Sequence, residues 1–393
     1  MSGMNQNLKE QPASFNAAIA HAARSQSLAP TVAEFFAGIG LVRLGLEAAG
    51  LKVVWSNDYE PKKKIMYRGH FLDAQDEHTF VLGDVGNITG QDMPSYLSLA
   101  WASFPCTDLS LAGNGKGIRD GESKTFWDFT RILKEMGERA PEVVCLENVP
   151  GLATSNGGDD LRAAVRALNN LGYSIDVVSL DARRFVPQSR ERLFLIGTKT
   201  RPTERDESVN ELRPSSLEFI RRDSSLITHA AVLPRPPSYL KGGLGNVIEE
   251  MSDDDSRWWD ADRTSAAMAS LSSTQAHRIE LLKQLKRPIY RTGYRRTRNG
   301  KPVWEFRDDD ISGCLRTARG GSSKQALLRI CNGTVNIRWM TPIEYARLMG
   351  AGDYKLGTVS DSQSIYGFGD AVCVPAVTWL AENYLIPLLS KDI

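Results

Sequence analysis

Cys106 is the residue in this sequence whose surroundings best suit covalent chemistry. It follows a proline and a short apolar stretch, LAWASF, and precedes a polar, glycine-rich segment, TDLSLAGNGKG. A cysteine that only fills a core lies more naturally inside an apolar run, as Cys145 does in EVVCLEN. A thiolate at a strand end can attack an electron-poor carbon if positive charge or a helix dipole lowers its pKa. The alternative interpretation is an inert, small hydrophobic residue at the end of a strand.

Other polar or glycine residues also stand where short apolar runs end. With Cys106, the residues that close or follow these runs are Gly38, Gly40, Asp58, Asp84 and Glu147. In an open α/β sheet, ligands bind beyond the carboxyl ends of the strands. We therefore expect these residues to share a single site.

The first of these turns, FAGIG, is only a weak nucleotide-binding motif, because it lacks the full G-x-G-x-x-G spacing. Asp58, 18 residues after Gly40, strengthens it. An acidic residue about 20 positions after such glycines typically accepts hydrogen bonds from ribose hydroxyls. The sequence has no phosphate-binding loop, which disfavours a nucleoside triphosphate. An adenosine cofactor without a phosphate tail, with S-adenosylmethionine as the first candidate, fits this pattern better.

The elements that must position these residues are strands that alternate with helical segments up to about residue 200. This alternation predicts the α/β class with a mostly parallel, Rossmann-like sheet. After residue 200 the alternation breaks, which indicates a second, smaller domain. We expect four parts: a flexible N-terminal arm (1–30), a catalytic and cofactor-binding α/β domain (31–201), a smaller domain (202–310), and a return to the first domain that completes the cofactor pocket (311–393).

The composition is that of a globular protein, with 41% apolar and 24% charged residues among 393. The net charge of +1 means that any nucleic-acid binding must come from a local patch. Five cysteines without a close metal-type pair indicate a reducing compartment and no metal site. We find no apolar run of about 18 residues and no secretory signal, so we expect a cytoplasmic protein that does not engage a membrane.

Five segments resemble, in order, the motifs of the DNA (cytosine-5)-methyltransferase family. They are FFAGIGLVRLGLEAAG, FPCTDLS, LENVPGL, PQSRERLFLIG and YGFGDAVCVPAV, and they run from about residue 31 to residue 385. The resemblance implies a Rossmann-like S-adenosylmethionine-dependent methyltransferase that methylates C5 of a flipped-out cytosine in a specific double-stranded DNA sequence. It also implies that the smaller domain (202–310) is a target-recognition domain.

The resemblance assigns roles to matching positions. Cys106 would attack C6 of the base, Glu147 would contact N3 and the exocyclic amine, and Arg192 would contact O2, with Arg190 in support. The cofactor-binding residues would be Phe36, Gly38, Gly40, Asp58, Asp84, Val85, Pro105, Asp370, Ala371 and Val372. Three residues depart from the usual pattern of the family, since Glu34 replaces a common Asp, Leu41 a frequent Gly and Asp370 the usual Asn.

A DNA duplex hides C6 of cytosine within the base stack, so the base must be extruded. The glycine-rich segment 107–124 predicts a loop that closes over DNA, or alternatively a merely flexible surface loop. Arginines interleaved with aromatic residues in 287–306 suit phosphate anchoring and base reading, although a solvated hairpin would look similar. Strand alternation would place Gln188, Arg190 and Arg192 on one face. The expected DNA-binding residues are Gln188, Ser110, Arg291, Arg295, Arg296, Arg298, Arg316 and Arg319.

Two other functions stay open at this point. A tRNA cytosine-5 methyltransferase would keep the same chemistry, although the substantial middle region favours DNA. A catalytically silent DNA-binding module could share the scaffold, but such a protein need not keep all of Cys106, Glu147, Arg190 and Arg192. The expected context is restriction–modification or related DNA modification by a monomer. Whether a restriction endonuclease or defence system acts on the same site is left open.

Overall fold

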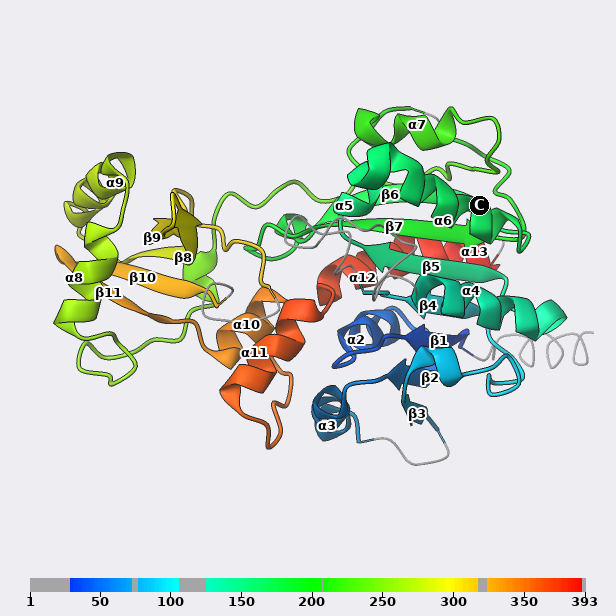
Figure 1. Cartoon of the computed structure of the whole chain (residues 1–393), viewed down its shortest axis with the longest axis horizontal. Coiled ribbons are helices and arrows are strands. Elements are labelled where there is room, and N and C mark those ends of the chain that lie inside the picture. Colours follow the sequence, from blue (N-terminus) through cyan, green and yellow to red (C-terminus); the bar gives the residue numbers. More distant parts are fainter. Residues whose placement is uncertain (1–28, 73–76, 106–124, 207, 317–323, 391–393) are drawn as a thin grey trace, which may run out of the picture.

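The computed structural model describes residues 29–72, 77–105, 125–206, 208–316 and 324–390, and it contains two sheets. Figure 1 shows the larger sheet and the smaller sheet as neighbouring units along the long axis of the molecule. The larger sheet has seven strands in the order β3-β2-β1-β4-β5-β7-β6, and the smaller has four in the order β11-β10-β8-β9.

The larger sheet is parallel except at β7. Its strands are β1 (Thr31–Phe35), β2 (Lys52–Asp58), β3 (Thr79–Leu82), β4 (Leu99–Ala102), β5 (Val143–Asn148), β6 (Ser174–Asp181) and β7 (Glu191–Thr198). β7 runs antiparallel to both β5 and β6. The strand order reverses at β1, which pairs with both β2 and β4, and ligands bind beyond the carboxyl ends of strands at such a switch point. The expected α/β, Rossmann-like fold class is confirmed.

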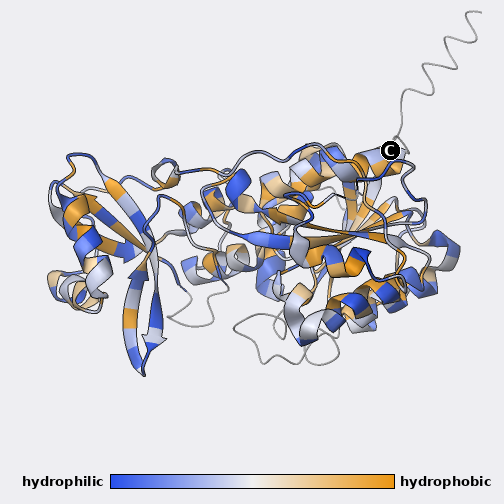
Figure 2. Ribbon diagram, turned by 90° about the horizontal axis from the view of Figure 1, so that it is seen from above, coloured by the Kyte–Doolittle hydropathy of each residue, from blue (hydrophilic) through white to orange (hydrophobic). Residues whose placement is uncertain are grey.

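Helices cover both faces of this sheet, as the apolar strands between hydrophilic helix surfaces show in Figure 2. On one face α4 (Thr125–Met136) and α6 (Asp159–Asn169) share a core with alternate residues of β1, β4 and β5. On the other face α2 (Leu41–Ala48) and α12 (Val374–Leu380) pack on the intervening residues. Three further helices lie between or after the strands: α3 (Pro61–His70) follows β2, the short α5 (Gly151–Thr154) follows β5, and the short α7 (Glu218–Arg221) follows β7.

The end of the chain packs beside its beginning. Segment 361–390 comprises α11 (Asp361–Asp370), α12, a π-helical turn and α13 (Ile386–Ser390). It is long and apolar enough to cross a membrane by composition, but half of its most apolar window is buried inside the protein. At Gly45 of α2 a Cβ would come within 2.6 Å of Val377, so the glycine permits α2 and α12 to approach closely. We therefore assign this segment to the core, where it brings Asp370 next to the first strands.

The smaller sheet is antiparallel, with strands β8 (Ile289–Arg298), β9 (Lys301–Phe306), β10 (Ala326–Cys331) and β11 (Thr334–Trp339). Asn-Gly turns with positive φ at both residues, 299–300 and 332–333, close its two tight hairpins. The helices α8 (Ala261–Ala269) and α9 (Ser273–Lys283) cover one face through a tryptophan-rich core. Beyond the sheet, α10 (Pro342–Leu348) and α11 join an apolar cluster with Ile39 and Leu41 of the larger unit.

Strand pairing divides the chain differently from the boundaries expected at 201/202 and 310/311. Residues after 201 still belong with the larger sheet, because Thr228 bridges Ile175 of β6 and Leu217 enters the core under α6. Residues after 310 still belong with the smaller sheet, because β10 pairs with β8. The physical reason is the same in both places: β6 and β8 each have an edge whose backbone groups need partners.

Candidate active site and nucleic-acid interface

The turn between β1 and α2 leaves room for a ligand. Phe36, Gly38 and Gly40 all have positive φ (58°, 57° and 81°), which is unusual and strained for a phenylalanine. A Cβ added at Gly38 would meet no atom of the described residues within 4 Å, so this glycine borders open space. At Gly40 a Cβ would lie 2.5 Å from the ring of Phe71, so that glycine is required by packing.

Two acidic residues end the next two strands at the same edge. The backbone N–H of Gly38 donates to Asp58 Oδ2 at 2.8 Å, and that of Glu60 donates to Asp58 Oδ1 at 2.8 Å. The carboxylate of Asp58 is thereby fixed beside the open space at Gly38. Asp84 accepts from the N–H of Gly86 and starts the short turn that buries Val85. A strained aromatic, open space and a fixed carboxylate suit an adenosine ligand.

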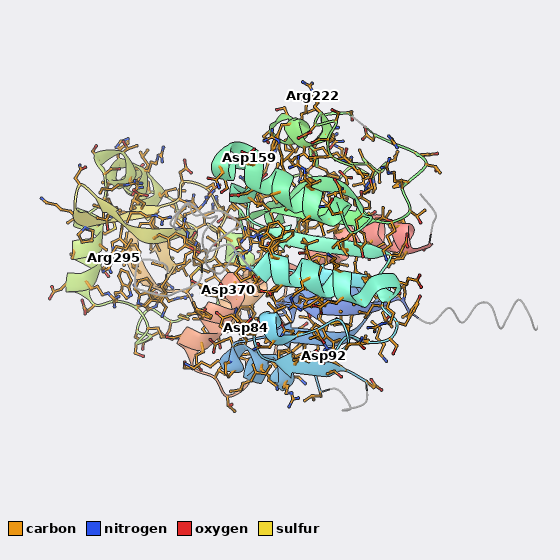
Figure 3. The ribbon with its side chains drawn as sticks, turned by 45° about the vertical axis from the view of Figure 1, so that its right-hand side comes forward. Asp84, Asp92, Asp159, Arg222, Arg295 and Asp370 are labelled. Atoms are coloured by element: carbon orange, nitrogen blue, oxygen red, sulfur yellow. The ribbon has the colours of Figure 1, made fainter. Side chains whose placement is uncertain are left out.

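The last predicted motif reaches the same end of the sheet. Asp370 ends α11 and is followed by Ala371 and the buried Val372. Figure 3 labels Asp84 and Asp370 toward the end of the larger sheet that faces the smaller unit. Asp370 Oδ2 accepts a hydrogen bond from Lys63 Nζ of α3 at 2.8 Å.

Sequence reasoning missed Lys63, although a signal was present. Three consecutive lysines follow Pro61 in the first turn of α3, where the helix dipole disfavours positive charge. A cluster of lysines in that position therefore indicates a role other than stabilising the helix.

The chain leading to Cys106 is held by the neighbouring strand. Asn148 at the end of β5 donates through Nδ2 to the carbonyl oxygen of Phe104 at 3.1 Å. This bond fixes the backbone just before Pro105, the last described residue ahead of the gap. The predicted nucleophile Cys106, Ser110, Arg319, the glycine-rich segment 107–124 and most of the N-terminal arm lie outside the described residues.

Glu147 and Arg192 form an ion pair at the same sheet edge. Arg192 Nε lies 2.9 Å from Glu147 Oε1, and the two side chains are 14% and 8% exposed. Glu147 follows Leu146, which lies opposite Ala102 at the end of β4. The pair therefore stands beside the strand that leads to Cys106, as expected for residues that act on one substrate.

Arg190 is buried and bound to backbone. Its guanidinium donates to the carbonyl oxygens of Leu315 (2.8 Å), Gly369 (3.1 Å) and Ala371 (2.7 Å). Burial, and to a smaller extent the charge of Arg192, lowers its pKa from the usual value. These contacts give Arg190 a positioning role that fastens the last motif to the start of β7.

Cys314 is a second residue that sequence reasoning did not single out. Its Sγ lies 3.3 Å from a guanidinium nitrogen of Arg190. Burial alone would raise the pKa of Cys314, but the charges of Arg190 and Arg192 outweigh burial and hold the pKa below its usual value. The thiol marks the point where the smaller unit meets the Glu147–Arg192 pair.

The prediction that Gln188 contacts DNA is wrong. The side chain is fully buried, Nε2 donates to the carbonyl oxygen of Leu348 at 2.7 Å, and Oε1 accepts from the N–H of Leu315 at 3.0 Å. Gln188 also precedes β7, so it does not share a strand face with Arg192. Its amide joins the segments around Leu348 and Leu315. Both polar ends of the amide are paired there, and leaving either one unpaired in the interior would cost free energy.

The arginines of β8 lie on two faces of the smaller sheet. Arg295 pairs with Trp304, whose ring belongs to the core under α8 and α9, so Arg291 and Arg295 are on that face. Arg291 is mostly buried against α9 and lies 3.8 Å from Asp310, so the prediction that Arg291 contacts DNA is wrong. Arg295 is exposed, and Figure 3 labels it on the smaller unit.

Arg296 and Arg298 are on the opposite face, with Tyr294. The guanidinium carbons of Arg296 and Arg316 lie 5.0 and 5.6 Å from the centre of the Tyr294 ring. Burial and the charge of Arg316 lower the pKa of Arg296. Arg298 forms an ion pair with Glu305 at 2.6 Å.

The Tyr294 face is directed at the larger unit. The hydroxyl of Tyr294 donates to the carbonyl oxygen of Cys314 at 2.6 Å, and Cys314 contacts Arg190. Figure 2 shows the β8–β9 hairpin projecting from the body of the molecule with a hydrophilic tip. Two neighbouring guanidiniums on one ring suit an anionic partner such as a phosphate backbone.

Comparisons with known proteins show which family this chain resembles. A family model described as C-5 cytosine-specific DNA methylase matches residues 31–385. The Type II methyltransferase M.HhaI of Haemophilus parahaemolyticus is 32% identical over 353 residues, which cover 89% of this chain and 92% of that protein. M.Bsp6I of a Bacillus species is 33% identical and M.HaeII of Haemophilus aegyptius 36% identical, each over 42% of this chain. The chain spans about half the length of these two relatives, 51% and 49%.

Solved structures share the fold at low sequence identity. The crystal structure of S. pombe Dnmt2 methyltransferase superposes with a TM-score of 0.56 at 18% identity, and it covers 92% of this chain and 99% of that one. A putative DNA modification methyltransferase from an E. coli prophage gives 0.55 at 16% identity, with coverages of 92% and 100%.

Proposed function

This chain belongs to the C-5 cytosine-specific DNA methylase family, and from that premise we propose that it methylates C5 of a cytosine in double-stranded DNA with S-adenosylmethionine as the methyl donor. The likeness to Type II methyltransferases supports a role in restriction–modification. In a restriction–modification system, a restriction endonuclease would recognise the same DNA sequence as this chain. The methyltransferase would act as a cytoplasmic monomer.

The observation that carries the proposal is the Glu147–Arg192 pair, with 2.9 Å between Arg192 Nε and Glu147 Oε1, beside the strand that leads to Cys106. Cytosine C5 is a poor nucleophile in the intact aromatic ring. Addition of the Cys106 thiolate to C6 breaks the aromaticity and makes C5 nucleophilic. The electrons move toward N3 and O2, where Glu147 would act on N3 as the general acid and the charge of Arg192 would stabilise O2.

The cofactor, when bound, supplies an electrophilic methyl group. Loss of the C5 proton and elimination of the Cys106 sulfur then restore the aromatic ring and leave 5-methylcytosine. Within the chain, Asn148 holds the backbone ahead of Cys106 and Arg190 holds the last motif, so that both parts of the site keep their relative positions.

The open space at Gly38 supports a cofactor site there. The carboxylate of Asp58 would bind the ribose hydroxyls, and Asp84 at the next strand end would face the adenine side. The remaining residues proposed to line the site are Phe36, Gly40, Val85, Pro105, Asp370, Ala371 and Val372.

We place the DNA on the Tyr294 face of the smaller sheet. Arg296 and Arg316 would contact phosphates or base edges, with Arg298 and Arg295 at the projecting end of the hairpin. The target cytosine would leave the stack to reach Glu147 and Cys106.

The test is methyl transfer from labelled S-adenosylmethionine to duplex DNA by the full chain. Cys106→Ser should abolish transfer, whereas Cys331→Ser, at the end of β10 in the smaller unit, should leave it intact. A parallel reaction with tRNA separates the DNA activity from the RNA alternative. Transfer that persists in Cys106→Ser would reject the covalent mechanism. Bisulfite sequencing of DNA from cells that express the protein would then give the target sequence.

A further inference from the structure

Lys63 and Asp370 connect two parts of the cofactor site that are 307 residues apart in the chain. Lys63 lies in the first turn of α3, directly after β2 and Asp58, and Asp370 is the last residue of α11. Their nitrogen and oxygen are 2.8 Å apart, and the side chains are only 12% and 29% exposed. The pair is only partly shielded from solvent, since Lys63 is half-buried and Asp370 is an exposed residue. Holding a lysine and an aspartate together at the edge of a binding site therefore calls for an explanation other than the stability of the fold.

The charge state of Lys63 is fixed by its surroundings. Burial alone would lower the pKa of Lys63, but the carboxylates of Asp370 and Asp58 outweigh burial and hold the pKa above its usual value. The ammonium also lies 5.5 Å from the ring of Tyr366. A positive charge is therefore permanently present beside the Asp58 carboxylate to which we assign the ribose.

Such a charge matters for a ligand that is itself positive. The methyl donor carries a sulfonium, whereas its demethylated product, S-adenosylhomocysteine, has a neutral thioether. An uncompensated ammonium in the pocket would repel the donor and leave the product unaffected. Asp370, which stands where the resembling family usually has Asn, supplies the negative charge that compensates Lys63.

We propose that the Lys63–Asp370 ion pair sets the preference of the pocket between the sulfonium methyl donor and its uncharged product. The inference rests on the proposed function, because it requires that the donor binds at this site. It explains why a lysine in an unfavourable helix position and an aspartate outside the family pattern occur together in this chain.

The experiment is isothermal titration of the full chain with S-adenosylmethionine and with S-adenosylhomocysteine. The variants are Asp370→Asn, Lys63→Met and the double variant, with Lys62→Met as the matched control one residue away on the exposed side of α3. Asp370→Asn should reduce the ratio of donor affinity to product affinity about tenfold. That is the order expected when one unit charge is removed from the pocket at an effective dielectric constant of about 20.

Lys63→Met should raise the same ratio, because two carboxylates then remain in the pocket. The double variant should return it to within about twofold of the wild type, and Lys62→Met should leave it unchanged. Melting curves of each variant identify loss of folding, and Lys63→Gln serves as the replacement if Lys63→Met does not fold.

Two results would overturn the inference: equal affinity changes for both ligands, or shifts of the affinity ratio in the same direction in both single variants. Either result would mean that the ion pair only holds α3 against α11. A wild-type protein that binds neither ligand would refute the proposed function itself. A wild-type protein that binds both, with ratios that no variant moves, would refute this inference alone.

Discussion

Replacing Glu34 by Gln should make the protein more stable at neutral and alkaline pH. Glu34 lies in β1 and is fully buried; Ser56 Oγ donates to its Oε2 at 3.3 Å, and Oε1 has no hydrogen-bond partner among the described residues. Burial raises the pKa of Glu34 from 4.5 to about 8, although the positive charge of Arg43 opposes the rise. In the folded protein the carboxyl group is therefore mostly protonated at pH 7.

The sign of the effect follows from proton linkage. Between pH 4.5 and pH 8 the folded state holds a proton on Glu34 that the unfolded state has released, so the free energy of unfolding falls as pH rises. One pKa unit corresponds to about 1.4 kcal/mol, which gives a cost of about 3 kcal/mol at pH 7. Glutamine has the same shape and no proton to lose, so Glu34→Gln removes this cost.

The assay is urea unfolding of wild type and Glu34→Gln at pH 5, 6, 7 and 8. The free energy of unfolding of the variant, minus that of the wild type, should grow by about 1.4 kcal/mol for each pH unit up to about pH 7 and level off near pH 8. Glu77→Gln, at an exposed position before β3, is the control and should show no such trend. A difference that is flat from pH 5 to pH 8 would show that Glu34 is already ionised in the fold and would refute the reasoning.

Three further outcomes are expected. Burial lowers the pKa of His229 from 6.5 to about 4, so the unfolded state takes up a proton at a higher pH than the folded state does. The free energy of unfolding, measured by urea unfolding, should therefore fall by up to about 3 kcal/mol as pH drops from 6.5 to about 4. His229→Asn should abolish this loss. Glu147→Gln should lower kcat for methyl transfer by about 100-fold to 10,000-fold while DNA affinity in a gel-shift assay stays within a few-fold, and an unchanged kcat would contradict its role at N3. Arg296→Ala and Arg316→Ala should each reduce the salt dependence of DNA binding by about one charge in fluorescence anisotropy at several KCl concentrations. Arg291→Ala, on the face covered by α9, should leave that slope unchanged, and an equal effect would contradict the assignment of faces.

The sequence predicts the positions of Asp58 and Glu147 because both follow local rules. Each closes an apolar run, and the carboxyl ends of parallel strands meet at one edge, so the strand pattern alone brings them together. The Asn-Gly pairs at 299–300 and 332–333 were equally local signals of hairpins. They predict the β8–β9 and β10–β11 hairpins separately. Only the observed pairing of β10 with β8 joins the two hairpins in one sheet and moves the end of the smaller unit past residue 310.

The buried hydrogen-bond partners of Gln188 and Arg190 could not be predicted from local sequence patterns. Their partners, such as Leu315 and Ala371, are 125 to 181 residues away in the chain. A motif that shows only alternating long polar side chains does not distinguish a group that faces a substrate from one that binds buried carbonyls. Lys63 is an intermediate case, since its unfavourable helix position was visible in the sequence but Asp370 as its partner was not.

Segment 312–315 is where these long-range contacts meet. The N–H of Ser189 donates to the carbonyl oxygen of Ser312, Gln188 accepts from the N–H of Leu315, and Arg190 donates to its carbonyl oxygen. On the other side, the hydroxyl of Tyr294 in β8 donates to the carbonyl oxygen of Cys314. If DNA binds the Tyr294 face as proposed, a displacement of that face would either break a buried hydrogen bond or move the backbone that holds Arg190. The start of β7, which carries Arg192, would move with that backbone. Because leaving a buried polar group unpaired costs about 1–3 kcal/mol, the second response would be favoured. DNA contact would then be linked to the Glu147–Arg192 geometry through this short segment.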